Sequence, residues 1–284
     1  MKHITCIFTV IKNEHEYLDE WIRYHLNLGI DHIFIFEDYD SLSHESICNK
    51  YKDKVSLLSI FNILNEDDKQ KAIYYKNTKK GYVHPIYIRN GLSYIKNNFK
   101  LYDWCFVIDI DEFITLENNN ESLDNILDLY TKYDAFIMAW KHYGANGLIL
   151  KPDYSNKGVL DTYIKESKKY LITNNAKHLV KTCYNIKKYN EEYPGNTHMP
   201  SNACNWCNSS LCKYIDISLY RNIYLRHYIT KSWEEYIWKK HIRGYMWGVN
   251  RNYDLFFKIN PDMNSKKNEL IEFAENYIEK HKNE

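Results

Sequence analysis

Two closely spaced carboxylates are the residues of this sequence best suited to chemistry. Asp109 and Asp111 follow an apolar run at 104–108 that is typical of a buried strand. In an extended chain both carboxylates project to one side and Ile110 points the other way. They then leave the carboxyl end of a strand, where open α/β sheets bind ligands. Because neighbouring carboxylates repel each other unless a cation lies between them, the pair predicts a site for Mn²⁺ or Mg²⁺, with a nucleotide diphosphate completing the coordination.

The pair has three other interpretations. A solvated acidic turn is the plain alternative, and the buried strand before the pair favours the metal site over it. Phosphatases of the haloacid dehalogenase type need Thr or Val two residues beyond the second aspartate, where this chain has Phe113. A calcium-binding EF-hand loop needs glycine at its sixth position, which is Ile114 here.

Further polar residues are expected near the same edge of the sheet. Lys12, Asn13 and Glu14 follow the first predicted strand and begin a helix, where backbone N–H groups can meet a nucleotide. For Asn13, simple capping of that helix is an equal alternative. Asp38 ends the second strand and can bond a uracil N–H or a ribose, or it is a turn aspartate. Arg89 can reach the diphosphate or the donor sugar, or it is a surface arginine.

A second set of candidates comes from the later part of the chain. Lys239 and Arg243 lie one helical turn apart and can neutralise a leaving diphosphate, unless they form a solvated basic face. Cys204, Cys207 and Cys212 make only part of a structural zinc site, so reduced thiols are the default for them and a zinc site stays an open alternative.

The elements that must position these residues follow from the apolar pattern. Alternation of strands and helices predicts an α/β domain with a mostly parallel sheet. After residue 144 the pattern loosens into loops and short strands. Strands are expected at 3–11, 32–36, 55–60, 104–108 and 135–140, helices at 85–99, 123–133, 233–243 and 266–281, and a loop with some helix at 65–80.

Several motifs in a fixed order resemble the family-2-like and family-92-like glycosyltransferases. The resemblance is densest before residue 150, and two departures in it, at 84–85 and 145–147, leave donor and acceptor identity open. The motifs are Val10-Ile11-Lys12-Asn13-Glu14, the stretch from Leu18 to His25, Arg89-Asn90-Gly91-Leu92, Ile108-Asp109-Ile110-Asp111-Glu112-Phe113, Trp140-Lys141-His142-Tyr143-Gly144, Arg226-His227-Tyr228, Lys231-Ser232 and the stretch from Lys239 to Gly244.

The resemblance implies a GT-A-type nucleotide-sugar-binding fold and transfer of one sugar to an acceptor. It also implies His227 as a third metal ligand, since neutral imidazole binds Mn²⁺. Trp140 and His142 are expected to form the acceptor wall. Inversion at the sugar needs a general base. His198 is the candidate for that base, with an unassigned Asp or Glu as the alternative.

Composition and charge set the remaining expectations. The formal net charge of +1 gives no reason to expect nucleic acid. With no signal peptide and no apolar segment of membrane-spanning length, a cytoplasmic location is expected, with attachment to a membrane surface through a partner or the substrate left open. Residues 1–143 are expected to bind nucleotide and metal, and residues 144–284, with the C-terminal helices, to bind the acceptor.

The sequence thus predicts a metal-dependent, inverting glycosyltransferase that moves a sugar from a UDP-sugar to a glycan or lipid-linked acceptor. A sugar nucleotidyltransferase is one alternative, but it should carry a glycine-rich loop after the first strand, which 12–15 lacks. An inactive carbohydrate-binding protein is the other.

Overall fold

The computed structural model describes residues 2–78, 83–167, 179–212, 221–243 and 253–281. A single curved sheet with the strand order β3-β2-β1-β4-β7-β6-β9-β5 forms the centre, and β8 pairs with β6 beside this path. The strands are β1 (Thr5–Ile11), β2 (His32–Glu37), β3 (Val55–Ser59), β4 (Trp104–Val107), β5 (Glu112–Leu116), β6 (Ala135–His142), β7 (Val180–Asn185), β8 (Trp206–Asn208) and β9 (Ile223–His227).

The first four strands in space form a parallel block. β1 pairs in parallel with β2 and with β4, and β2 with β3. Every residue of β1 and β4 is buried, as the continuous apolar runs predict for strands covered on both faces. Because the strands are parallel, the residues that follow β1, β2 and β4 meet at one edge of the sheet.

Strands from the later part of the chain complete the same sheet. β7 runs antiparallel between β4 and β6, and β9 lies between β6 and β5. Both expected halves of the chain therefore contribute to one sheet, and the division of labour between them stays a prediction.

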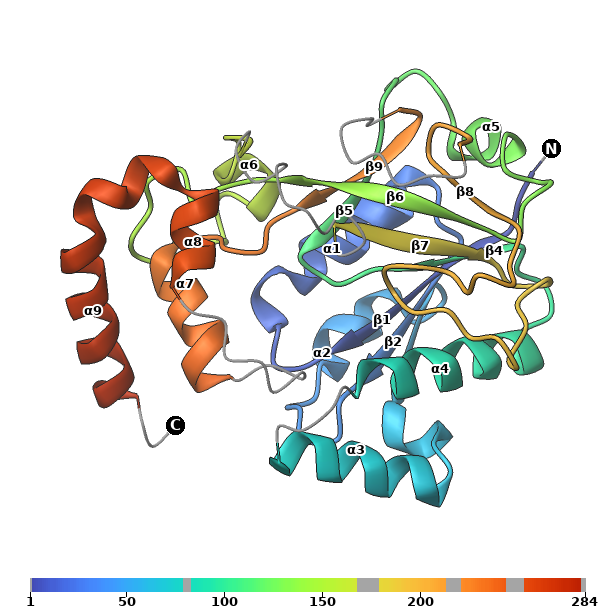
Figure 1. Ribbon diagram of the computed structural model, residues 1–284, viewed down its shortest axis with the longest axis horizontal. Coiled ribbons are helices and arrows are strands. Elements are labelled where there is room, and N and C mark those ends of the chain that lie inside the picture. Colours follow the sequence, from blue (N-terminus) through green and yellow to red (C-terminus); the bar gives the residue numbers. More distant parts are fainter. Residues whose placement is uncertain (1, 79–82, 168–178, 213–220, 244–252, 282–284) are drawn as a thin grey trace.

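Helices flank this sheet and extend beyond one end of it (Figure 1). Short 3₁₀ turns cover Asn49–Tyr51, Ile60–Ile63 and Pro261–Lys266, and a π-helical segment covers Trp238–Ile242. The α-helices are α1 (His15–Leu28), α2 (Glu45–Cys48), α3 (Glu66–Thr78), α4 (His84–Asn98), α5 (Leu123–Asp128), α6 (Val159–Thr162), α7 (Trp233–Ile237), α8 (Asp254–Ile259) and α9 (Lys267–Lys280).

Helix α1 fixes the position of β5. Trp21 Nε1 donates to the carbonyl of Glu112 at 2.8 Å, and His25 Nε2 accepts from the backbone N–H of Ile114 at 3.2 Å. The helix ends where Gly29 takes a left-handed φ of 107°, as expected for a C-terminal glycine. Its first turn differs from the expectation, because Glu14 occupies the N-cap position without a side-chain cap and Asn13 does not cap the helix.

The C-terminal helices have a small core of their own. Trp233 lies at its centre and donates from Nε1 to the carbonyl of Leu270 at 2.8 Å. Ser232 and Glu235 form a capping box at the start of α7. Figure 1 shows α7, α8 and α9 grouped beside the sheet, at the left of the view, away from α3 and α4 below it.

The expected α/β architecture is confirmed: a mostly parallel central sheet with flanking helices and C-terminal helices. The segment 65–80, predicted as a loop with some helix, is mainly helical, because Glu66–Thr78 forms helix α3. That helix buries only Asp68 and Ala72, so the sequence carries no apolar stripe that would reveal it. The helix expected at 123–133 ends at Asp128, and the one expected at 233–243 changes to a π-helix after Ile237.

Within the described part of the chain, none of the helices combines the length and the apolar composition needed to cross a membrane.

Candidate active site

The Asp109–Asp111 pair lies on a tight turn between β4 and β5, which corrects the extended geometry expected for it. The backbone N–H of Glu112 donates to the carbonyl of Asp109 at 3.0 Å. In return, the N–H of Asp109 donates to Glu112 Oε2, also at 3.0 Å. As a result, the two aspartates meet different cations: Asp109 Oδ2 lies 2.7 Å from Lys181 Nζ, and Asp111 forms an ion pair with Lys239.

The turn and the strand register bring three possible metal ligands together. Glu112 begins β5 and is the direct cross-strand partner of His227, the last residue of β9. His227 Nε2 lies 3.7 Å from Asp111 Oδ1 and 3.9 Å from Glu112 Oε1. One ligand atom from each of Asp111, Glu112 and His227 falls within 4.8 Å of the others, and all three side chains are buried. Among the described residues this is the one such group of His, Cys, Asp and Glu side chains.

The protonation states of this group suit a hard divalent cation. Burial, and to a smaller extent nearby cationic groups, hold the pKa of His227 well below its ordinary value despite the opposing charge of Asp111, so the imidazole is neutral. Burial alone would raise the pKa of Asp111, but the ammonium groups of Lys239 and Lys231 outweigh it and the pKa is lowered. Burial raises the pKa of Glu112 well above its usual range, an effect that a bound cation would oppose.

The donor atoms also fit the expected metal ion. Neither His227 Nδ1 nor Glu112 Oε1 has a hydrogen-bond partner in the described structure, although both are buried. Two carboxylates and an imidazole form a donor set that Mn²⁺ accepts well. Relative to the expected set of Asp109, Asp111 and His227, the structure places Glu112 in the group and turns Asp109 toward Lys181.

Lys181 is a residue that sequence reasoning missed. It lies on β7, is 1% exposed, and places its ammonium 2.7 Å from Asp109 and 3.6 Å from Glu112. Its one signal in the sequence is a lone lysine inside the apolar strand Val180–Asn185. Burial would lower the pKa of Lys181, but Asp109 and Glu112 outweigh it and raise the pKa.

A cavity of about 600 Å³ adjoins the group of Asp111, Glu112 and His227, because Lys239 lines the cavity and also contacts Asp111. Its walls come from the start of α1, the loop after β2, the segment after β9, α7 with its π-helical extension, and α9. The charged and polar side chains that line it include Lys12, Asn13, Glu14, Asp40, Lys151, Lys231, Glu234, Glu235, Lys239 and Arg243.

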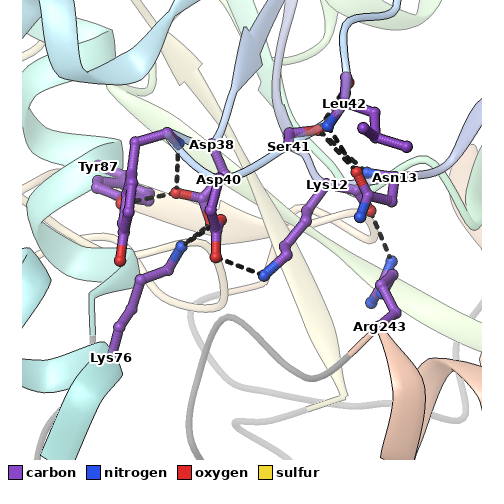
Figure 2. Close-up of polar contacts among 10 residues, drawn as sticks. Lys12, Asn13, Asp38, Asp40, Ser41, Leu42, Lys76, Tyr87 and Arg243 are labelled. Carbon is purple, nitrogen blue, oxygen red and sulfur yellow. Dashed lines mark hydrogen bonds and ion pairs between the residues drawn. The ribbon is translucent and has the colours of Figure 1, made fainter. Parts of the chain in front are cut away.

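Most cations at this cavity are paired with carboxylates. Lys12 Nζ lies 2.7 Å from Asp40 Oδ2, and Arg243 Nη1 lies 2.5 Å from Glu14 Oε1. Arg243 also donates to the carbonyl of Lys12 at 3.4 Å, so the π-helical segment is tied to the end of β1 (Figure 2). The cavity thus gathers Lys12, Asn13, Glu14, Lys239 and Arg243, and their roles toward a nucleotide sugar stay predictions.

Asn13 and Asp38 have structural partners that the sequence did not indicate. Asn13 has a left-handed φ of 50°, and its Oδ1 accepts from the N–H of Leu42 at 2.7 Å. Asp38 is buried and bonded to Tyr87 at 2.9 Å and to Lys76, so it does not line the cavity (Figure 2). Asp40, two residues later, lines the cavity in its place.

Arg89 is not brought to the cavity or to the metal-ligand group. Its guanidinium lies 2.7 Å from Asp68 Oδ2, which joins α4 to α3. The expected role of Arg89 at the diphosphate therefore has no support in the arrangement of the described residues.

The residues expected to bind the acceptor are buried near His227 and do not lie at the cavity. Trp140 and His142 are 7% and 2% exposed, and neither lines the cavity. The ring of Trp140 lies 4.2 Å from that of His227, and the ring of His142 lies 5.1 Å from it. His198 contacts the carbonyl of Val180 at 2.8 Å through Nδ1 and the Trp140 ring at 5.3 Å. Trp140 and His142 therefore pack against His227, and His198 packs against Trp140.

The cysteines of the possible zinc site do not form a group of three metal ligands among the described residues. Cys204, Cys207 and Cys212 have free thiols, and they form no metal-ligand group within the ranges that the structure describes.

Comparison with known proteins finds one curated relative, and no family model matches the chain. A Ricinus communis protein named as a glycosyltransferase family 92 protein is 24% identical over 225 residues, which cover 66% of this chain and 38% of the relative. The chain therefore spans well under half of the relative's length.

Similarity to solved structures is low throughout. HddC from Yersinia pseudotuberculosis is 13% identical with a TM-score of 0.35, over 73% of this chain and 91% of that one. Glucosyl-3-phosphoglycerate synthase from Mycobacterium tuberculosis, solved with Mn²⁺, UDP and phosphoglyceric acid, is 11% identical with a TM-score of 0.31, over 65% of this chain and 56% of that one. The Ricinus communis relative is therefore the informative match. Its similarity confirms the resemblance of this chain to the family 92 glycosyltransferases that the motifs indicate.

Proposed function

We propose that this chain is a metal-dependent glycosyltransferase that moves a sugar from a UDP-sugar to a glycan or lipid-linked acceptor with inversion. The observation that carries the proposal is the cavity beside Asp111, Glu112 and His227, at the edge where the residues after β1, β2 and β4 meet. Ligands of parallel α/β sheets bind at this kind of edge. The similarity to a family 92 glycosyltransferase supports the same chemistry.

In this proposal Asp111, Glu112 and His227 hold Mn²⁺ or Mg²⁺. When bound, the cation acts as a Lewis acid on the diphosphate of the donor. Asp109 lies 2.7 Å from the buried ammonium of Lys181, whereas Glu112 lies farther from it, at 3.6 Å.

The protein's own cations then stabilise the leaving group. Lys239 and Arg243 line the cavity and are held in place by Asp111 and Glu14. Charges fixed before reaction need no reorganisation as negative charge develops on the departing diphosphate. Lys12 and Asp40, at the ends of β1 and β2, lie where the nucleoside is proposed to bind.

The general base is proposed among the carboxylates that line the cavity. His198 does not line it, whereas Glu234 does and is part-exposed there. The Asp or Glu alternative for the base is therefore preferred, with Glu234 as its first candidate. The acceptor class, the division between residues 1–143 and 144–284, a cytoplasmic location and any peripheral membrane association stay predictions.

A hydrolysis screen tests the proposed function. UDP-, GDP-, CMP- and dTDP-sugars are incubated with the protein and Mn²⁺, and release of the nucleotide diphosphate or monophosphate is measured. The proposal expects slow release from at least one UDP-sugar, which EDTA removes and added Mn²⁺ restores. The absence of donor binding and of hydrolysis above the uncatalysed background, for every donor tested, would count against it.

A further inference from the structure

Lys231 differs from the other lysines and arginines that line the cavity. It is 3% exposed, yet no carboxylate oxygen of the described residues lies within the 4.0 Å of its ammonium that an ion pair requires. Lys12, Lys239 and Arg243 each have such a partner. The contact recorded for the Lys231 ammonium is the ring of Tyr17, with its centroid 4.0 Å away.

We infer that the ammonium of Lys231 is the binding group for the diphosphate of the nucleotide-sugar donor, an inference that rests on the proposed function. A buried charge without a counter-ion is costly, and proteins rarely retain one unless a ligand completes it. The cavity beside Lys231 is large enough for a nucleotide diphosphate, and the carboxylates around it are already engaged.

The neighbouring carboxylates cannot serve as the missing counter-ion in this arrangement. Glu235 accepts from Tyr163 at 2.7 Å, from Ser232 Oγ at 2.7 Å and from Tyr154 at 2.6 Å. Asp111 is paired with Lys239, and Glu14 with Arg243. These are the anions that act on Lys231, and each has stronger contacts elsewhere.

The electrostatics of Lys231, Lys239 and Arg243 agree with this assignment. Burial and then Lys239 lower the pKa of Lys231. The pKa of Lys239 and of Arg243 is raised, because Asp111 and Glu14 outweigh the effect of burial. An anion bound beside Lys231 would supply the compensation that the other two cations already have.

The local backbone holds Lys231 in place. Its φ of 49° lies in the left-handed region, which is uncommon for a residue with a side chain. Ser232, next along the chain, begins the capping box of α7, and Thr230 before it is 1% exposed. Strained positions of this kind persist where the surrounding structure fixes them and cluster at ligand sites.

Calorimetric titration with inorganic pyrophosphate, in buffer free of divalent cations, tests the assignment. Lys231→Met should weaken pyrophosphate binding by about tenfold or more, as expected for loss of a charge-assisted hydrogen bond. Lys231→Arg should keep binding within about threefold. Lys151→Met is the matched control, because Lys151 lines the same cavity but is half-exposed and paired with Glu16; it should change binding less than about twofold. Equal affinities for wild type and Lys231→Met would overturn the inference.

A second measurement covers the case in which Lys231→Met does not fold. Lysines of the wild type are reductively methylated with ¹³C-formaldehyde, and the Lys231 signal is assigned by its loss in Lys231→Arg. That signal should shift on addition of pyrophosphate, and a signal that does not move would contradict the assignment.

Two further arms separate this inference from the proposed function. UDP should compete with pyrophosphate; if both bind at once, the anion site serves another phosphate-bearing ligand and the donor assignment is wrong. If Lys231→Met binds pyrophosphate normally while wild type turns over a UDP-sugar, the inference fails and the function stands. If no donor reacts although pyrophosphate binding depends on Lys231, the proposed function fails and the anion site stands.

Discussion

The ammonium of Lys239 pairs with Asp111 across 128 residues of sequence and joins the π-helical segment after α7 to the turn after β4. This contact connects the cavity to the group of Asp111, Glu112 and His227. Both partners are largely buried, with side-chain exposures of 16% and 4%. A substitution of either residue should therefore change the electrostatic environment of the other.

A double-mutant cycle on Asp111→Asn and Lys239→Met should give a coupling free energy of about 1–3 kcal/mol, because removing one partner leaves the other charge buried without compensation. The cycle is measured by urea unfolding without divalent cations. The exposed pair of Lys267 and Asp254, 3.5 Å apart, is the control and should give less than about 1 kcal/mol. Equal coupling in the two pairs would show that burial does not strengthen the Asp111–Lys239 contact.

Trp140→Ala should lower the affinity for Mn²⁺ by about tenfold, since the indole packs 4.2 Å from the ring of His227 and helps to orient it. Free Mn²⁺ is measured by electron paramagnetic resonance. His227→Ala should lose more affinity than Trp140→Ala. Trp206→Ala, at the far end of the neighbouring β6–β8 pair, is the control and should change affinity less than about twofold. An unchanged Mn²⁺ titration in His227→Ala would remove that residue from the ligand set.

Stability should fall as the pH falls below about 6.5, in part because of His25. Burial lowers the pKa of His25 from its ordinary 6.5 to about 3 in the folded chain. Between these two values the unfolded chain binds one proton more than the folded chain, so the contribution is complete above pH 6.5 and is lost progressively toward pH 3, at up to about 1.4 kcal/mol per pH unit. Thermal or urea unfolding between pH 4 and 7 should give a shallower slope for His25→Gln. Parallel curves for variant and wild type would exclude this contribution.

Gly91→Ala should destabilise the fold by about 1–3 kcal/mol through overpacking. A Cβ at this position in α4 would lie 2.1 Å from Cε2 of the buried Phe8 on β1. Phe8→Leu in the same chain should restore part of the loss. Gly29→Ala is the contrasting variant, because it meets open space and costs about 1 kcal/mol from its φ of 107° alone. Rescue of Gly29→Ala by Phe8→Leu would contradict the steric explanation.

The fold was largely predictable because its central strands are continuous apolar runs, such as the one that became β1, and because parallel strands bring their carboxyl ends to one edge. This rule correctly places Lys12, Glu14 and the Asp109–Asp111 turn at the same edge of the sheet. The rule does not predict which residue of a turn faces the cavity. It therefore favours Asp38, whereas in the structure Asp40 lines the cavity and Asp38 bonds to Tyr87.

Contacts between residues far apart in the chain could not be predicted from the sequence. The pairing of Lys181 with Asp109 depends on the register between β4 and β7, and the pairing of Glu112 with His227 on that between β5 and β9. Both registers join segments more than 70 residues apart. The sequence places Lys231 in a motif, but it does not show whether a carboxylate lies beside the ammonium. Only the folded chain decides that.

The most direct test of the account compares Asp111→Asn with Asp109→Asn in Mn²⁺-dependent turnover of the UDP-sugar that wild type uses. Asp111 belongs to the proposed ligand group, whereas Asp109 is held by Lys181. Turnover should fall at least about 100-fold in Asp111→Asn and only about tenfold in Asp109→Asn, with Mn²⁺ affinity lost in the first variant alone. Full turnover with unchanged Mn²⁺ affinity in a folded Asp111→Asn variant would contradict the account.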